Sequence, residues 1–494
     1  MSNLSVWDPI AVGHCQQLAV ALPGRVATPG TPPYDAFSKH FWSLQESTIS
    51  PPCVLEPRSS SDVSSMIDAL TKTGHECPFA VKGGGHSPYG GYANIHNGVV
   101  ISMAGLNTME ISDDHSVVKI GSGLTWLPVY EFLDQIGGLA VAGGENGDVG
   151  VGGLLVGGGI SILGPRVGWS CDNVVNFEVV LSSGQIINAN QTHHSDLWKS
   201  LKGGTNNFGV VTRYDLATVP QKGGIWAGSL EFSTRSYSDI FRAFVQIADS
   251  SEYDPYAFFS LELRFQNTSW SVETVLSYSR EVDTVSPPIF QPFLDLDSRA
   301  NFSSKNTNFT TVANRGSQSP SNQIALSTGT YKINMDLLDF IFSSTDAMVR
   351  ELSELHNNKL FWQVTFQPLP AAWNNQTRAK GGNSLGTDRI EGNSFVMLVT
   401  AMWPDNSLSA VTQSALETMQ QIIDYYANSR HLKRDLVYLN YAGEAQSPLL
   451  SYGKENVKVL AQTAKKYDPD GVFQRLVPGG FKLSKGRHNL ENII

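Results

Sequence analysis

Short apolar runs and one amphipathic stretch alternate between residues 51 and 91. The run 51–57 predicts a strand bracketed by prolines, and residues 61–70 carry apolar side chains at helical spacing. A second apolar run, 78–81, predicts a buried strand that leads directly into the glycine-rich loop 82–91. This order predicts an α/β unit that ends in a glycine loop.

The pattern changes after about residue 219. Before that point, β-branched runs such as 117–121 and 173–181 predict strands, and 126–136 predicts a helix. From Trp226 to about Tyr425, alternating apolar runs are interspersed with longer helical stretches. This second pattern predicts an antiparallel sheet covered by helices.

Composition and charge narrow the class of protein. The 494 residues are 41% hydrophobic and 16% charged, which is typical of a folded chain of two or three domains. The net charge of −10 argues against a nucleic-acid partner. No apolar run approaches the roughly 18 residues of a membrane span. Met1 to Gly13 lacks the layout of a signal peptide, so the chain is either not secreted or begins after a removed signal.

The four cysteines are spread along the first part of the chain, at Cys15, Cys53, Cys77 and Cys171. Their spacing fits neither a zinc site nor a CxxC redox motif. Four buried thiols and a Cys15–Cys53 disulfide both remain open, and the disulfide would imply a secretory route. The pair His193–His194 lacks a third ligand, so we expect a solvated loop and no metal.

Three glycine-rich segments, 83–91, 143–159 and 203–209, lie in the first part of the chain. Each glycine in regular structure costs about 1 kcal/mol, so a hydrophobic core gives no reason for so many. Val and Leu alternate with the glycines of the second segment, whereas a flexible linker is polar. A large flat ligand lying against bare backbone explains the pattern, and the turn before His86 can direct successive N–H groups at one anion.

Three kinds of side chain are candidates for chemistry. His86 ends the first glycine turn and could be a hydrogen-bonding loop residue, a base or an attachment point. The segment 437–441 predicts a strand, in which Tyr438 and Asn440 share one face and Tyr441 points to the other. We therefore expect both tyrosines to reach one site only if a bulge or bend intervenes. A phenol acts as a base only when its anion is stabilised, because its ordinary pKa is about 10; otherwise it is a buried aromatic.

A strand of the second part carries Trp362, Gln363, Thr365, Phe366 and Gln367. Its alternation would aim one set of side chains at a ligand. For the aromatic members we favour core packing.

Five motifs occur in order along the chain: Lys82–Ser87 (KGGGHS), Val149–Gly153 (VGVGG), Gly203–Gly209 (GGTNNFG), Tyr438–Tyr441 (YLNY) and Tyr467–Phe473 (YDPDGVF). Together they resemble the FAD-linked oxidases of the vanillyl-alcohol-oxidase superfamily, in particular the berberine-bridge-enzyme-like branch and its fungal members. The resemblance covers about residues 50–485. Each motif alone is weak, but five in order are specific.

The resemblance implies an α+β fold with an FAD-binding domain of the PCMH type, made of residues 1–219 and 430–494. A substrate domain, residues 220–429, would place its helix-covered antiparallel sheet over the flavin ring. We expect a monomer that binds a small organic substrate and O2, with no nucleic-acid, membrane or metal partner.

The resemblance also implies a covalent bond from a ring nitrogen of His86 to the 8α-methyl group of the flavin. Many members have a second link, through a cysteine three residues before the valine of the second glycine loop. Asn146 occupies that position, so we expect a single link. This argues against a sugar oxidase, because doubly linked members tend to have open sites that accept oligosaccharides. Besides His86, the implied cofactor-binding residues are Lys82, Gly83, Gly84, Gly85, Ser87, Gly90, Gly144, Asp148, Val149, Gly152, Gly153, Gly159, Gly209, Val211 and Asn440.

For the reaction, the resemblance places the catalytic base at Tyr441, with Tyr438 as the substitute. Val149 matches the position that controls oxygen access, where a small residue favours an oxidase that releases H2O2. We expect oxidation of a C–OH or C–N bond in a specialised metabolite, with oxidative ring closure as an option. A secreted mono- or oligosaccharide oxidase and a non-redox flavoprotein cyclase are the alternatives. A secretory or extracellular location is expected if the disulfide forms and a signal was removed, and a cytoplasmic one otherwise.

Overall fold

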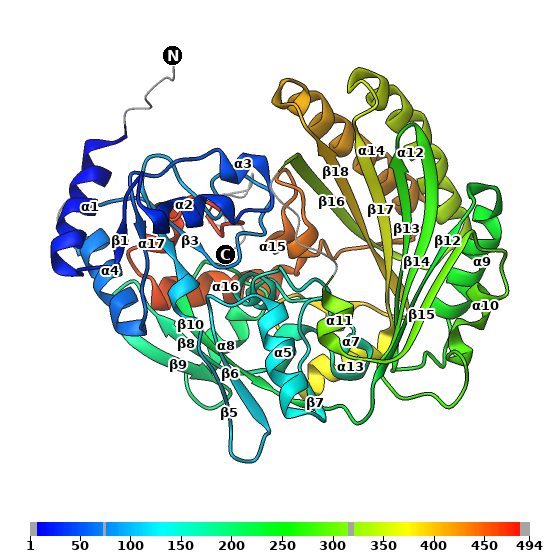
Figure 1. Ribbon diagram of the computed structural model, residues 1–494, viewed down its shortest axis with the longest axis horizontal. Helices are drawn as coiled ribbons and strands as arrows, with labels where there is room; N and C mark the ends of the chain where they lie inside the picture. The colour runs from blue at the N-terminus through cyan, green and yellow to red at the C-terminus, as the bar shows by residue number, and fades with distance from the viewer. Residues whose placement is uncertain (1–6, 73–75, 315–320, 485–494) are drawn as a thin grey trace.

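Two groups of sheets lie side by side in the molecule (Figure 1). The computed structural model describes residues 7–72, 76–314 and 321–484. Sheets of four, five and two strands are built from residues 26–220, and an eight-stranded sheet is built from residues 225–434. The chain therefore has the predicted α+β fold.

The first glycine loop follows a small, mostly parallel sheet. Strands β2, β4 and β3 are parallel, and β1 is antiparallel to β2. Helix α4 (Ser60–Lys72) connects β2 to β3, and its predicted apolar face is fully buried, because Val63, Met66, Ile67 and Leu70 have no exposed surface. The strands are β1 (Val26–Ala27), β2 (Val54–Leu55), β3 (Phe79–Lys82) and β4 (Val99–Ser102).

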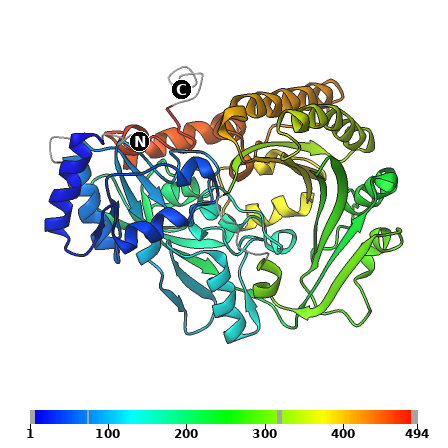
Figure 2. The ribbon, with the colours of Figure 1, turned by 45° about the horizontal axis from the view of Figure 1, so that its top comes forward.

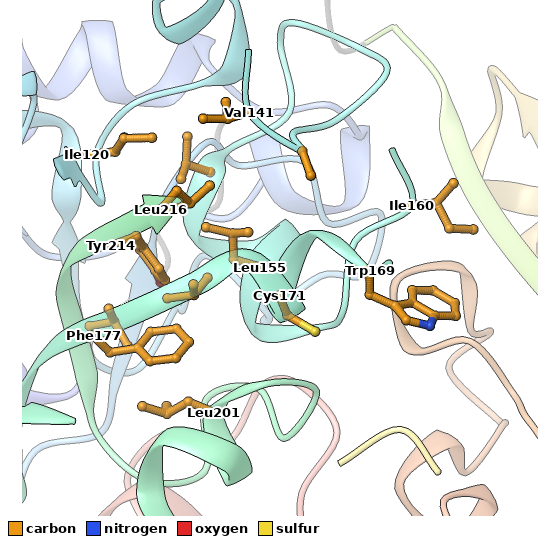
Figure 3. Close-up of a cluster of buried hydrophobic side chains, with 14 of the residues drawn as sticks. Ile120, Val141, Leu155, Ile160, Trp169, Cys171, Phe177, Leu201, Tyr214 and Leu216 are labelled. Atoms are coloured by element: carbon orange, nitrogen blue, oxygen red, sulfur yellow. The ribbon is translucent and has the colours of Figure 1, made fainter. Parts of the chain in front are cut away.

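The second and third glycine loops lie beside a five-stranded antiparallel sheet of order β5-β6-β10-β8-β9. Side chains from this sheet and from α6 and α8 point into one buried cluster, with Leu155 of α6 between the strands and Cys171 (Figure 3). The elements are β5 (Met109–Ile111), β6 (Val117–Gly121), β8 (Val174–Val180), β9 (Ile186–Asn190), β10 (Val210–Ala217), α5 (Trp126–Ile136), α6 (Val151–Val156), η2 (Ser170–Asn173) and α8 (Ser195–Leu201), with β7 (Leu139–Ala140) paired to β11 (Val219–Pro220).

The eight-stranded sheet is antiparallel throughout, in the order β15-β12-β14-β13-β17-β18-β16-β19. Helices α9, α12 and α14 cover the face that is turned away from the glycine loops (Figures 1 and 2). These elements are β12 (Ile225–Phe232), β13 (Ala257–Gln266), β14 (Ser269–Tyr278), β15 (Ala300–Thr307), β16 (Gln323–Lys332), β17 (Phe361–Leu369), β18 (Ser394–Trp403), β19 (Lys433–Arg434), α9 (Tyr237–Ala248), α12 (Met335–Leu355) and α14 (Ser409–Ser429).

Strand β17 divides its side chains between two environments. Trp362, Val364 and Phe366 are fully buried in the core beneath the helices, as favoured for the aromatic residues. The alternation therefore directs Gln363 and Gln367 to the opposite face, toward the glycine loops.

The end of the chain returns to the first group of sheets. The N–H of Phe79 donates to the carbonyl of Leu476 (2.7 Å), and the amide of Asn207 donates to the carbonyl of Phe481 (2.9 Å). Helix α16 (Lys454–Tyr467) lies beside α8, α15 (Pro448–Ser451) precedes α16, and α17 (Val472–Arg475) packs its Phe473 against Phe79 of β3.

The remaining elements are short or lie in the N-terminal arm, residues 7–50. Within the described residues, no helix has the length and apolar character needed to cross a membrane. Residues 1–6, part of the stretch Met1 to Gly13 that lacks the layout of a signal peptide, lie outside the described residues. The elements are α1 (Pro9–Ala21), α2 (Pro32–Lys39), α3 (Leu44–Ser47), η1 (Met103–Gly105), α7 (Gly164–Val167), η3 (Thr234–Ser236), η4 (Pro288–Phe290), α10 (Gln291–Leu294), α11 (Phe309–Ala313), α13 (Ala371–Ala379), η5 (Thr387–Arg389) and η6 (Asn406–Leu408).

The prediction of a strand at 437–441 is wrong. Residues Leu439–Tyr441 form a turn of 3₁₀-helix, η7, which begins after Tyr438. Side chains three residues apart lie on the same side of such a helix. The rings of Tyr438 and Tyr441 therefore meet edge to face, with centroids 4.8 Å apart, and do not point in opposite directions.

The disulfide between Cys15 and Cys53 is present, and Cys77 and Cys171 are free and buried. It joins α1 to the residue before β2, across a sequence separation of 38 residues. The N-terminal arm is thereby attached to the sheet that precedes the first glycine loop.

Removing this disulfide should destabilise the protein by about 4 kcal/mol, because closing a loop of this length restricts the unfolded chain by about that amount. We expect the double variant Cys15→Ala/Cys53→Ala to unfold at lower urea concentration than the wild type. A reductant should lower the wild-type midpoint to that of the variant and leave the variant unchanged. Equal midpoints for the two proteins without reductant would contradict the expectation.

Candidate functional site

The first and second glycine loops touch through bare backbone. A Cβ atom on Gly84 would lie 2.5 Å from the nitrogen of Gly150, and one on Gly85 would lie 2.6 Å from the carbonyl oxygen of His40. Gly85 also has φ = +71°, in the region that disfavours side chains. A side chain at Gly84 would separate the two loops, and one at Gly85 would push the turn away from the backbone of His40.

The turn that ends β3 presents unused backbone donors. Among the described residues, the N–H groups from Gly83 to Ser87 have no hydrogen-bond acceptor. Successive N–H groups in a glycine turn form a concave donor site for an anion. This turn therefore fits the pyrophosphate of the predicted FAD.

The imidazole ring of His86 is held by stacking on Trp42. Its imidazole lies parallel to the indole of Trp42, with centroids 4.3 Å apart and an interplanar angle of 4°. The N–H of Trp42 donates to the carbonyl of Gly85 (3.0 Å), which ties the N-terminal arm to the turn. The surrounding protein lowers the pKa of His86 to about 4 by desolvation. The imidazole is therefore neutral at pH 7, the form in which its nitrogen is a nucleophile.

Lys82 lies beneath the turn. Its ammonium group lies 4.8 and 4.4 Å from the ring centroids of Phe37 and Phe41, and its stem passes under Gly85. Burial lowers the pKa of Lys82 to about 8, and burial raises that of Glu46 to about 7. The Glu46 carboxylate accepts hydrogen bonds from the N–H groups of residues 91–93. Lys82 and Glu46 therefore both contact the first glycine loop and hold its backbone in place.

Asn146 lies at the start of the second glycine loop, at the position of the family's second covalent flavin link, and its side chain closes a turn. Asn146 accepts the N–H of Asp148 through its side chain (2.9 Å) and that of Val149 through its carbonyl (3.2 Å). Val149 is partly buried against the neighbouring core. The adjoining Glu145 accepts a hydrogen bond from Gln367 across the site (2.7 Å).

The other predicted cofactor positions fall into two groups. Most of the glycines are in close packing, where a Cβ would lie 3.1 Å or less from a neighbouring side chain or backbone atom. Gly153 is exposed, with nothing within 4 Å of such an atom, so it borders open space where a ligand can lie against the backbone. The packed positions and their neighbours are Gly90 (Gln45), Gly144 (Trp126), Gly152 (Tyr214), Gly159 (Ser170) and Gly209 (Val179), and Val211 is buried in β10.

Tyr438 holds the C-terminal segment against the second glycine loop. Its hydroxyl oxygen accepts hydrogen bonds from the N–H groups of Gly159 (3.0 Å) and Ile160 (3.1 Å) and from the amide of Asn440 (3.0 Å). Asn440 also donates to the carbonyl of Leu154 (3.1 Å). Burial raises the pKa of Tyr438, and the three donors partly oppose this.

Tyr441 lies at the junction of the two groups of sheets. Its hydroxyl donates to the side-chain oxygen of Gln367 on β17 (3.0 Å). The Tyr441 side chain is partly exposed, whereas Tyr438 is 1% exposed. Tyr441 is therefore the tyrosine that a ligand between the sheets can reach.

Sequence reasoning missed two parts of this site. Trp42, which stacks on His86, lies in an N-terminal arm that showed little periodicity. The role of Glu145 as the partner of Gln367 depends on a contact across 222 residues, for which the local sequence gives no signal.

The pair His193–His194 is exposed, as expected. His193 contacts the hydroxyl of Thr192 (3.0 Å) and His194 that of Tyr467 (3.0 Å). No group of metal-ligating side chains occurs in the part of the chain that the structure describes.

Comparison with known proteins identifies the same cofactor. The FAD binding domain family matches residues 51–190. The FAD-dependent monooxygenase sdcF of Emericella nidulans is 30% identical over 475 residues, which are 95% of this chain and 98% of that protein.

Two solved structures show the same fold across nearly the whole chain. BBE-like 1 of Physcomitrella patens has a TM-score of 0.75 at 17% identity, covering 96% of this chain and 100% of that one. The xylooligosaccharide oxidase of Myceliophthora thermophila C1 has a TM-score of 0.76 at 16% identity, covering 96% and 99%.

Replacing Tyr438 by Phe should destabilise the protein by about 2 kcal/mol, because buried donors that lose their acceptor cost about that much. A matched control is Tyr34→Phe, which removes one hydroxyl donated to the carbonyl of Pro51 in the N-terminal arm. We expect the control to cost about 1 kcal/mol. Urea unfolding measures both, and a Tyr438→Phe effect no larger than the control would show that the hydroxyl is not an anchor.

Proposed function

Because the chain belongs to the berberine-bridge-enzyme-like branch of the vanillyl-alcohol-oxidase superfamily of FAD-dependent oxidoreductases, we propose that it oxidises a C–OH or C–N bond of a small organic substrate. The observation that carries the proposal is the different setting of the two motif tyrosines. The Tyr438 hydroxyl is occupied by three protein donors, and the Tyr441 hydroxyl lies on Gln367 between the sheets. This arrangement supports Tyr441 as the group that contacts the reacting substrate.

FAD would be held by the first two glycine loops. His86 would carry the covalent bond, and the N–H groups that precede and follow it would bind the pyrophosphate. Gly153 would lie against the cofactor, and Lys82 would support the loop without direct contact. When bound, FAD would supply the acceptor for the hydride and the route by which the electrons reach O2.

In its deprotonated form, as a phenolate, Tyr441 would take the proton of the substrate O–H or N–H group and become a phenol. Tyr438 would stay a phenol and position η7, because burial raises its pKa and its oxygen is already bound. Gln367 would orient Tyr441 from the eight-stranded sheet.

Val149 supports O2 as the electron acceptor, because a small side chain leaves space for it. The name of the relative sdcF supports a second candidate, a monooxygenase that puts an oxygen atom into the substrate. The two activities differ in where the oxygen of O2 ends, in H2O2 or in the organic product.

The substrate would be a specialised metabolite. Asn146 at the position of the second link disfavours an oligosaccharide, although the xylooligosaccharide oxidase shares the fold. A non-redox cyclase would leave the flavin oxidised when substrate is added without O2.

The organisation of the protein follows from the same proposal. Residues 1–219 and 430–494 would form the FAD domain, and residues 220–429 the substrate domain. We propose a monomer, and the Cys15–Cys53 disulfide supports a secretory route.

The covalent link can be tested by colour. Acid-precipitated wild-type protein should stay yellow, and His86→Ala should lose the colour because the attachment atom is gone. His115→Ala is a matched control, because His115 lies in an exposed turn between β5 and β6. Loss of the colour from the wild type on precipitation would rule out the link.

The reaction can be tested by following both oxygen atoms. With a panel of alcohols, amines and saccharides under ¹⁸O₂, an oxidase yields about one H2O2 per substrate oxidised and unlabelled product. Label in the product would establish the monooxygenase instead, and broad turnover of saccharides the sugar oxidase. Tyr441→Phe should lower kcat by about 100-fold or more, the usual contribution of a positioned base, whereas Tyr34→Phe should leave it unchanged. Wild-type turnover in Tyr441→Phe would exclude Tyr441 as the base.

A further inference from the structure

Three side chains from distant segments form one hydrogen-bonded chain beside the site. Tyr441 of η7 donates to the side-chain oxygen of Gln367 (3.0 Å). The side-chain nitrogen of Gln367 donates to Oε1 of Glu145 (2.7 Å). Gln367 is 4% exposed, so its amide has little access to water. This hydrogen-bonded chain therefore links Glu145, in the loop before α6, to Tyr441 through Gln367 of β17.

The direction of this chain is fixed at one end. An ionised carboxylate accepts hydrogen bonds and cannot donate one. Oε1 of Glu145 accepts from the nitrogen of Gln367, so that nitrogen faces Glu145. Because the amide is planar and two-ended, its oxygen must then face Tyr441. Tyr441 must consequently be the donor, with its proton on the phenol.

We propose that Glu145 is a positioning residue that fixes the direction of this hydrogen-bond chain and keeps Tyr441 a neutral phenol until alkaline pH. The proposal rests on the proposed function, in which Tyr441 is the base. An amide oxygen beside a phenolate is repulsive, whereas an amide N–H₂ group would stabilise it. Glu145 thus sets the pH range in which the base form of Tyr441 exists.

Tyrosines and carboxylates lie on the elements around this hydrogen-bonded chain. Tyr438 lies against Tyr441 on η7, and Tyr130 and Asp134 lie on α5, where Tyr130 experiences the charge of Glu145. Tyr89 donates to the carbonyl of Ala442 just after η7, with Glu444 and Tyr92 near it. Each of these side chains is neutral or negative, so none of them favours a phenolate.

The same direction affects which substrates are recognised. Since the Tyr441 proton is directed to Gln367, any other group that hydrogen-bonds the phenol oxygen must be a donor. An alcohol O–H or amine N–H satisfies this requirement, and the carbonyl of the oxidised product does not. The direction of these hydrogen bonds would therefore favour binding of the reduced substrate over its oxidised product at the phenol oxygen of Tyr441.

The test is a titration of Tyr441 that needs no substrate. Tyrosinate absorbance is recorded against pH for the flavin-loaded wild type and for Glu145→Gln, each minus the same protein carrying Tyr441→Phe. A glutamine at 145 can donate as well as accept, so the Gln367 amide can turn and stabilise the phenolate. We expect the Tyr441 midpoint to fall by about one pH unit, a tenfold change in its dissociation constant.

Two controls separate hydrogen-bond direction from simple loss of charge. Asp134→Asn removes a neighbouring carboxylate that binds Thr310 and not Gln367, and should leave the midpoint nearly unchanged. In a Gln367→Met background, Glu145→Gln should no longer shift the midpoint, because no amide remains to turn. An unchanged midpoint in Glu145→Gln, an equal shift in Asp134→Asn, or a shift that persists without Gln367 would each overturn the proposal.

If the Gln367→Met protein does not fold, the Tyr441 midpoint of Glu145→Gln is measured at low and high salt. This comparison separates loss of the Glu145 charge from reversal of the Gln367 amide. A shift caused by charge alone shrinks at high ionic strength, whereas a reversed hydrogen bond persists. With a substrate in hand, the alkaline rise of kcat/KM should move to lower pH in Glu145→Gln. Absence of covalent flavin or of turnover would count against the proposed function, whereas the titration tests the role of Glu145 independently.

Discussion

The hydroxyl of Tyr438 is the point at which the C-terminal segment joins the second glycine loop. It accepts the N–H groups of Gly159 and Ile160, which the tight turn after α6 leaves without another backbone partner. Buried N–H groups are costly when unpaired, so the phenol is required where it is. Because η7 begins after Tyr438, this anchor also decides where Tyr441 lies.

The position of Tyr441 then depends on the alternation of strand β17. Its aromatic side chains are buried under the helices, and this burial fixes the register of the strand. Gln367 is consequently held on the face toward the glycine loops, where it meets Tyr441 and Glu145. Packing on one side of the sheet thus determines polar geometry on the other.

The glycine loops combine close packing with open backbone. Gly84 and Gly150 allow two loops to touch, while the N–H groups from Gly83 to Ser87 are left for a ligand. Desolvation keeps His86 neutral beside them, stacked on Trp42. These features match the FAD binding domain that the comparisons identify.

Local sequence determined the elements whose pattern is repeated within a few residues. The apolar spacing of 61–70 gave α4, and the alternation of β17 separated Trp362 from Gln367, because both depend on neighbours in the chain. The ordered motifs indicate the family and its cofactor without any tertiary contact. Tertiary structure decided the rest. Hydrogen bonds from Gly159 and Ile160 hold Tyr438 at the start of η7, and a contact across 222 residues pairs Glu145 with Gln367, since such partners meet only when the chain is folded.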